Sequence, residues 1–176
     1  QIYLNIEQKF QLKNSHKYVQ SSNALLSLIA KNEPIDEVLK EVLRMIEAEL
    51  PNSLIVFFYY NFSKNELDQH IKGPRVVAGS LSIPSSIKKN QNSIFFESVE
   101  SQKTFKVPNL QAYDEDFLER DDFLNLGIHS LVNYPIVSND DKEHLYGQIS
   151  ILSKEEEISN SINPLLINHA LEVARL

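Results

Sequence analysis

Two apolar stretches joined by a polar turn decide the fold: GIHSLVNYPIV at residues 127–137 and LYGQISIL at residues 145–152. The residues between them, SNDDKE at 138–143, are of the types that favour turns. Gly127 opens the first stretch, Pro135 lies late in it, and Gly147 lies early in the second. Apolar stretches of strand length on either side of a turn predict an antiparallel β-hairpin.

The composition is that of an ordinary globular domain. The chain has 176 residues, of which 42% are hydrophobic and 23% charged, and this suits one domain with helical extensions. Its net charge of −7 argues against a surface for nucleic acids or anionic membranes. No stretch approaches the roughly 20 apolar residues of a membrane helix, and no secretory signal is seen, so we expect a cytoplasmic protein. Because cysteine is absent, disulfides, thiolate metal sites and cysteine nucleophiles are excluded.

Periodicity along the rest of the chain predicts strands flanked by helices. Residues 34–50 carry apolar side chains three and four positions apart, which predicts a helix with Pro34 at its start. Residues 53–60 are apolar at both alternating sets, as in a strand buried on both faces. Further strands are expected at 76–81 and 104–107, a loop or turn at 61–74, and helices at 93–101, 113–126 and 161–176. This order predicts an α+β domain whose antiparallel sheet has about six strands, with flanking helices.

The chain resembles a GAF domain over about residues 24–176. In that family a Gly-Ile-x-Ser strand ends in Pro-Ile and is followed by a turn and a Gly-containing strand, as in residues 127–152. Residues 98–109, SVESQKTFKVPN, resemble the family's helix end, polar turn, short strand and Asn. The resemblance implies a GAF-like fold and a sensory or regulatory module that binds a small molecule or pairs with a copy of itself.

The residues present do not support three functions known among GAF domains. The Asn-Lys-Phe-Asp-Glu set of cyclic-nucleotide-binding members is not recognisable, and the cysteine that attaches bilins is absent. The methionine-sulfoxide reductases of the family need catalytic cysteines, which this chain also lacks. No catalytic Ser-His-acid context and no phosphate-binding loop is found. We therefore expect a domain without enzymatic activity of its own and without a cofactor.

Polar residues interrupt both strands of the predicted hairpin. Asn133 interrupts the first strand, and Gln148 and Ser150 interrupt the second. A buried polar side chain must find a hydrogen-bond partner. These residues therefore form either the polar wall of a small-molecule cavity or a surface that faces solvent or bonds to a covering helix. The register, which a turn of this length leaves open, decides which of them share a face.

Two aromatic residues and one histidine complete the predicted binding site. Phe58 and Tyr60, in the strand at 53–60, either line a ligand cavity or belong to the core. His129 lies where GAF domains often place a polar side chain near the mouth of the pocket, and the alternative is a surface histidine. The predicted ligand-binding residues are Asn133, Gln148, His129, Tyr60 and Phe58.

No metal site is predicted. The acidic residues at 114–122, Glu119 among them, match no cation-binding loop and indicate a solvated helix face, or a lid over the pocket. The five histidines include no pair at the spacing of a helical metal site.

Arg75, beside the start of a predicted strand, either meets an anionic ligand or is an ordinary surface cation.

Together these features predict a sensory domain of a signal-transduction protein, with a kinase, a cyclic-dinucleotide enzyme or a transcription regulator as output. Ligand binding between the sheet and residues 82–126 would shift the flanking helices. We divide the chain into an N-terminal signalling or dimerisation helix at 1–31, the GAF-like domain at 32–160, and a C-terminal helix at 161–176 that leads to an output domain. A ligand-free homodimerisation module and a small enzyme of unrecognised type remain as alternatives. The expected partners are a small molecule and a second copy, and neither nucleic acid nor a membrane.

Overall fold

A six-stranded antiparallel sheet forms the centre of the molecule. The computed structural model describes residues 8, 20, 23–24, 26–79, 81–138 and 144–174. The strands lie in the order β3-β2-β1-β6-β5-β4, and every neighbouring pair is antiparallel. Their bounds are β1 (Ser53–Asn61), β2 (Glu66–Lys72), β3 (Ser86–Lys88), β4 (Phe105–Val107), β5 (Ser130–Val137) and β6 (Leu145–Ser153). The predicted α+β class and six-stranded sheet are confirmed.

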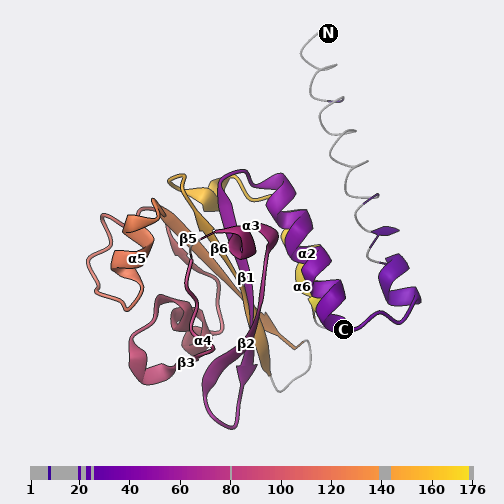
Figure 1. The fold of residues 1–176 in the computed structure, drawn as a ribbon, viewed down its shortest axis with the longest axis horizontal. Helices are drawn as coiled ribbons and strands as arrows, with labels where there is room; N and C mark the ends of the chain where they lie inside the picture. Colours follow the sequence, from indigo (N-terminus) through magenta and orange to yellow (C-terminus); the bar gives the residue numbers. More distant parts are fainter. Residues whose placement is uncertain are drawn as a thin grey trace.

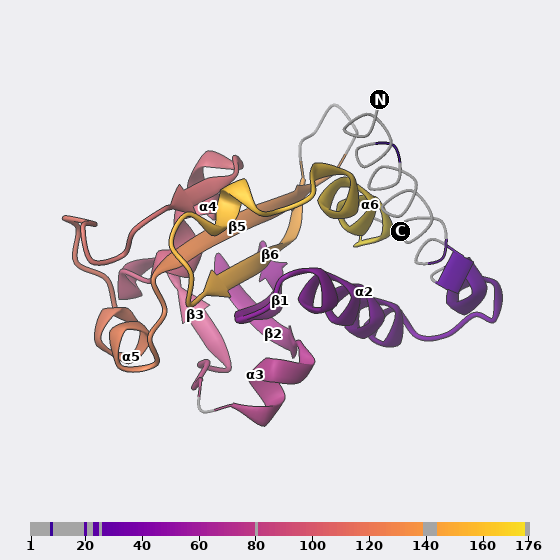
Figure 2. The same cartoon turned by 90° about the horizontal axis from the view of Figure 1, so that it is seen from above.

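Helices cover both faces of this sheet. On one face α2 (Ile35–Glu49) and α6 (Pro164–Ala174) lie side by side (Figure 1). Figure 2 shows the sheet between this pair and the segments on the other side. Those segments are η2 (Ile94–Phe96), α4 (Glu97–Ser101) and α5 (Arg120–Asn125), while α3 (Pro74–Ala78) lies beside β1. The symbol η denotes a short 3-10 helix. Besides η2 the described residues form two more, η1 (Lys89–Gln91) and η3 (Ile158–Asn160).

Alternation along β1 builds two separate hydrophobic cores. Ile55 and Phe57 belong to the core beneath α2 and α6. Val56 and Phe58 belong to the core beneath η2, α4 and α5. Because successive side chains of a strand point to opposite faces, one apolar strand supplies both cores. The prediction that residues 53–60 are buried on both faces is confirmed.

The helix α2 packs its apolar stripe onto the first of these cores. Leu39, Val42 and Ile46 are fully buried there, as their spacing predicts. Ile35, the first residue of the predicted stripe, is instead 45% exposed. On the outer side Lys40 pairs with Glu37 at 2.7 Å, one turn apart. This helix is therefore the main cover of one sheet face.

The predicted hairpin is confirmed as β5 and β6, and β1 is the other neighbour of β6. The register that the sequence left open places Asn133 opposite Ser150 and Pro135 opposite Gln148. It shifts between Ile136 and the residue that follows it.

Three local predictions are wrong. Residues 76–81 were expected to form a strand, but Pro74 occupies the first turn of α3, where its fixed φ and missing N–H favour a helix. The second strand is instead β2, within the predicted loop, where Leu67 and Ile71 provide buried apolar side chains. The helix predicted over 113–126 is confined to α5. The hydrogen bonds from Arg120 to the carbonyls of Glu115 and Tyr113 hold the preceding residues as a loop.

The structure describes only part of the two predicted terminal helices. Residues 164–174 of the predicted C-terminal helix form α6. Most of the N-terminal segment 1–31 lies outside the described residues, so its predicted role stays a prediction. Within the described ranges no helix is both long and apolar enough to cross a membrane.

Candidate functional site

Three of the predicted ligand-binding residues meet beneath η2 and α4. Asn133, Gln148 and Phe58 come from β5, β6 and β1, and each is 1% exposed or less. Asn133 pairs with Ser150, and Gln148 lies two positions from Ser150 on the same face, opposite Phe58 of β1. Central strands of the sheet thus place two amides and an aromatic ring together.

Main-chain carbonyls of η2 accept hydrogen bonds from both amides. Asn133 Nδ2 donates to the carbonyl of Ile94 at 3.0 Å, and Gln148 Nε2 donates to the carbonyl of Phe95 at 2.7 Å. Ser98 Oγ, from α4, donates to Gln148 Oε1 at 2.6 Å. Of the interpretations that the sequence left open, bonding to a covering helix is the arrangement observed. The role of Ser98 was missed because its partner lies far away in the sequence.

One polar atom of this cluster has no partner among the described residues. Asn133 Oδ1 is buried, and no hydrogen-bond donor reaches it from the described residues. An unsatisfied buried acceptor costs about 1–3 kcal/mol. A donor group from a water molecule or a small ligand would remove that cost.

Glu119 holds the same segment from another direction. Its carboxylate accepts hydrogen bonds from Ser93 Oγ and from the main-chain N–H of Ile94, the latter at 3.1 Å. Burial raises the pKa of Glu119, while these two hydrogen bonds act in the opposite direction. Glu119 is only 5% exposed, so its assignment to a solvated face is wrong. The neighbouring Asp121 and Asp122 are exposed, as that assignment predicts.

The remaining two predicted residues lie at opposite ends of the sheet. Tyr60, near the end of β1, donates its hydroxyl to Asn65 Oδ1 at 2.6 Å. His129 precedes β5 at the end where Ser130 pairs with Ser153. Its Nδ1 is buried, and no partner for it is found in the part of the chain that the structure describes. The structure therefore does not bring Tyr60 and His129 into one site.

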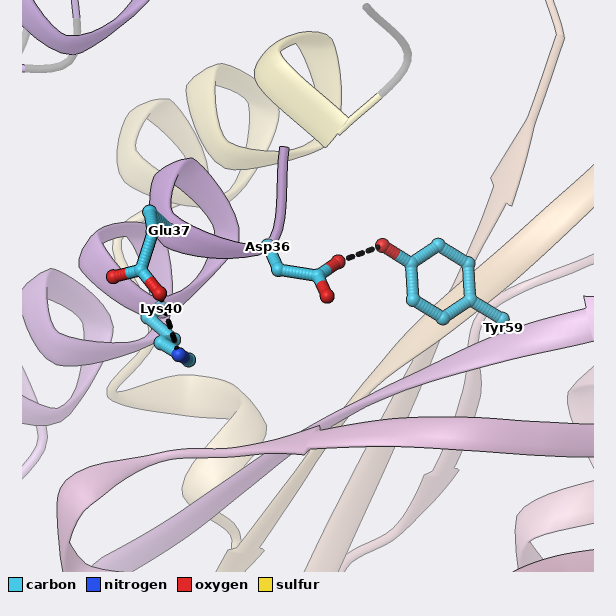
Figure 3. Close-up of polar contacts among 4 residues, drawn as sticks. All are labelled: Asp36, Glu37, Lys40 and Tyr59. Carbon is cyan, nitrogen blue, oxygen red and sulfur yellow. Dashed lines mark hydrogen bonds and ion pairs between the residues drawn. The ribbon is translucent and has the colours of Figure 1, made fainter. Parts of the chain in front are cut away.

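On the other face of β1, Tyr59 connects the sheet to α2. Its hydroxyl donates to Asp36 Oδ1 at 2.8 Å, and Figure 3 shows the two side chains pointing toward each other. Burial, and then the hydrogen bond to Asp36, raise the pKa of Tyr59 well above its ordinary value. Because Phe58 and Tyr59 are adjacent, β1 joins the cluster beneath η2 to the first turn of α2.

A cavity of about 340 Å³ lies at the opposite end of β1 from Tyr60. Arg75 is fixed at its wall, because Nη1 donates to the carbonyl of Leu50 at 2.8 Å and to that of Ser53 at 3.1 Å. The lining residues are Asn52, Ser53, Leu54, Arg75, Gly79, Leu81, Leu126 and Lys154. Among the described residues no group of three His, Asp or Glu side chains is placed to hold a metal ion.

Solved structures, rather than sequences, relate this chain to known proteins. No family model and no curated protein matches it. The GAF domain of a two-component sensor histidine kinase from Bacillus halodurans superposes with a TM-score of 0.57 at 19% identity, over 81% of this chain and 89% of that one. The GAF domain of an Acinetobacter phosphoenolpyruvate-protein phosphotransferase gives 0.59 at 10% identity, over 89% and 90%. The chain has a GAF-like fold.

An enzyme is also among the structures that share this GAF-like fold. Free methionine-R-sulfoxide reductase from Neisseria meningitidis, in complex with its substrate, superposes with a TM-score of 0.63 at 12% identity, over 90% of this chain and 86% of that one. This match contradicts the expectation that the domain is not an enzyme, because the same fold carries a catalytic activity in that protein. At 12% identity the likeness concerns the fold alone.

Proposed function

We propose that this GAF-like domain is the sensory or regulatory part of a cytoplasmic signal-transduction protein and binds a small molecule beneath η2 and α4. GAF domains among the matched structures support the proposal, one of them from a sensor histidine kinase. The observation that carries it is the buried Asn133 Oδ1, an acceptor without a partner in the described part of the chain. This oxygen lies beside the side-chain amides of Asn133 and Gln148, which donate hydrogen bonds to main-chain carbonyls of η2.

A ligand with both acceptor and donor groups fits this polar wall. Asn133 Nδ2 and Gln148 Nε2 now donate to two main-chain carbonyls of η2. A carbonyl or carboxylate of a ligand offers the same acceptor, and a ligand N–H or O–H would satisfy Asn133 Oδ1. Because η2 covers the wall, binding requires η2 and the adjoining α4 to move away from the sheet.

The strand β1 is the proposed path from this site to the helices. Phe58 contacts Phe95 of η2 with a ring-centroid distance of 4.9 Å. The next residue, Tyr59, holds Asp36 in α2, and α2 lies beside α6. A displacement of β1 would thus reach both helices, and through them an output domain such as a kinase, a cyclic-dinucleotide enzyme or a transcription regulator.

The proposal is tested by replacing Asn133 with Leu, which fills similar space without the amide. Amino acids, nucleosides and purines are screened for thermal stabilisation of the wild-type protein, and those that bind are titrated into each variant. Asn133→Leu should weaken binding about tenfold, with an unchanged circular dichroism spectrum. The control is Tyr146→Phe, at an exposed side chain. If Asn133→Leu binds every ligand with wild-type affinity, the wall is not the binding site.

Two exposed apolar side chains, one before α2 and one at its first residue, favour a second function, homodimerisation. Leu26 is 59% exposed and Ile35 is 45% exposed, although both are large aliphatic residues. A second copy that covered them would bury this surface. This alternative needs no ligand, and both functions are compatible with one protein.

A further inference from the structure

We propose that the cavity beside Arg75 binds a small organic anion with an apolar body, at a site separate from the wall beneath η2. The volume of about 340 Å³ lies within the range of small-molecule sites. Two of the lining residues are charged, Arg75 and Lys154, and both are cations. No acidic side chain is among the described lining residues, although the chain has a net charge of −7. This inference does not depend on the proposed sensory function.

Arg75 is held in place before any ligand arrives. Two main-chain carbonyls, of Leu50 and Ser53, fix Nη1, and the main-chain N–H of Arg75 donates to the buried carboxylate of Glu47 at 3.1 and 3.2 Å. The hydrogen bonds found within the described ranges engage no other guanidinium nitrogen, so Nε and Nη2 keep donors for a ligand. A guanidinium fixed in this way can bind a carboxylate or phosphate through two parallel hydrogen bonds at a reduced entropic cost.

The rest of the cavity is suited to an apolar group. Leu54 comes from the start of β1, Leu81 follows α3, and Leu126 is the residue directly after α5. Leu81 is 6% exposed and the other two are half-buried. An inorganic anion would leave the half-buried Leu54 and Leu126 uncovered, and a neutral hydrocarbon would leave the cations unused. The combination therefore selects a ligand with a charged head and an apolar body.

A second cation-rich groove lacks this arrangement. It is larger, about 720 Å³, and is lined by Lys64, Asn65, Glu66, Lys88, Lys89 and Asn90. Lys64 pairs with Glu66 at 3.8 Å, and Lys89 pairs with Glu100 at 2.9 Å. These carboxylates already compensate two of its cations. In the Arg75 cavity the described residues place no carboxylate within ion-pair distance of Arg75 or Lys154. Glu47, which interacts electrostatically with Arg75, bonds to the main-chain N–H of that residue, so Nε and Nη2 stay available to a ligand.

Titration with hexanoate, followed by NMR of the leucine methyl groups, tests the proposal on the whole chain. Hexanoate combines a carboxylate with an alkyl chain, whereas acetate and 1-hexanol each lack one of the two parts. We expect hexanoate to shift the signals of Leu54, Leu81 and Leu126 in a saturable manner and to bind about tenfold more tightly than either control. Hexyl phosphate, titrated in parallel, shows which head group the site prefers.

Two matched lysine variants distinguish binding in this cavity from nonspecific electrostatic attraction of the anion to surface lysines. Lys154 and Lys103 are both exposed, but only Lys154 lines the cavity. Lys154→Gln should weaken hexanoate binding about two- to fivefold, and Lys103→Gln should leave it unchanged. Arg75→Gln should abolish the preference for hexanoate over 1-hexanol. Since Arg75 also bonds to the main chain, the lysine pair decides the result if that variant fails to fold. The proposal is overturned if hexanoate shifts none of the three leucines, or if both lysine variants weaken binding equally.

Discussion

Among single residues, Glu119 links the stability of the protein to pH. Burial raises its pKa above the ordinary value of 4.5, so the folded state holds this proton more tightly than the unfolded state does. A raised carboxyl pKa contributes stability that is fully present below the unfolded pKa and is lost as the pH rises through the folded pKa. The contribution of Glu119 to stability is therefore largest in mild acid and declines as the pH rises.

Replacing Glu119 with Gln should remove this contribution to the pH profile. We expect the unfolding free energy of Glu119→Gln to increase relative to that of wild type as the pH rises from about 4 to about 7. A carboxyl pKa that is higher by one in the folded state corresponds to a change of about 1.4 kcal/mol. Urea unfolding at a series of pH values measures the difference. Glu156→Gln, at an exposed position, is the control for the removal of a carboxylate. A difference between Glu119→Gln and wild type that stays constant with pH would contradict the raised pKa.

The sequence predicts some residues of the site and not their partners. Asn133 and Gln148 interrupt apolar strands, so their burial and need for hydrogen bonds could be inferred. Their acceptors are main-chain carbonyls of Ile94 and Phe95, and every residue has a carbonyl, so no side-chain pattern marks these two. Glu119 could not be told from the acids around it, because only the packed structure separates buried from exposed carboxylates.

At the scale of elements, the close approach of β1 and β6 depends on Gly147. A Cβ at this position would lie 2.1 Å from the carbonyl oxygen of Phe58, a main-chain atom that cannot rotate away. Gly147→Ala should therefore cost about 3 kcal/mol or more of unfolding free energy. At Gly127 a Cβ would meet no atom within 4 Å, and the cost of Ala arises from the φ of +72° alone, about 1–2 kcal/mol. Urea unfolding of the two variants compares them, and equal losses would contradict the close approach.

The attachment of α2 to the sheet depends on Tyr59. Tyr59→Phe removes the hydrogen bond to Asp36 and keeps the ring, so we expect a loss of about 1 kcal/mol. Hydrogen exchange in the first turn of α2 should become faster. Tyr146→Phe removes a hydroxyl from an exposed tyrosine and should change neither quantity. Equal effects of the two variants would show that the bond does not hold α2.

Elements with buried apolar residues on both faces were the easiest to predict. The strands β1, β5 and β6 lie at the centre of the sheet, so most of their side chains are apolar. The strand β2 has only two apolar residues, and its polar side chains resemble those of a loop. Val76 and Val77 favour a strand by their side chains, yet the proline two residues before Val76 starts the helix α3. Local propensity was overridden there by the backbone restriction of a single residue.

At the scale of the whole molecule, α2 and α6 run antiparallel, so the start of α2 and the end of α6 lie at the same end (Figures 1 and 2). Leu26 and Ile35, both exposed, lie in the segment that leads into α2 and at its first residue. A second copy that docks here would contact both flanking helices.

Dimerisation at this end is tested by light scattering over a wide concentration range. We expect a dimer whose fraction rises with concentration and falls in the double variant Leu26→Glu and Ile35→Glu, because charges at a buried interface are costly. The control is Val77→Glu, at a residue 71% exposed in α3. A strict monomer at every concentration, or a dimer that the double variant leaves intact, would contradict dimerisation through these helices.

The division of β1 between two cores also limits how the length of the chain can vary. One residue inserted into β1 before Phe58 would turn the later side chains of the strand to the opposite side. Phe58 would then enter the core beneath α2, and Tyr59 would lose Asp36. An insertion in the turn at residues 62–65 leaves the alternation of β1 intact. Insertions and deletions are therefore tolerated better in the hairpin turns than in the part of β1 before Phe58.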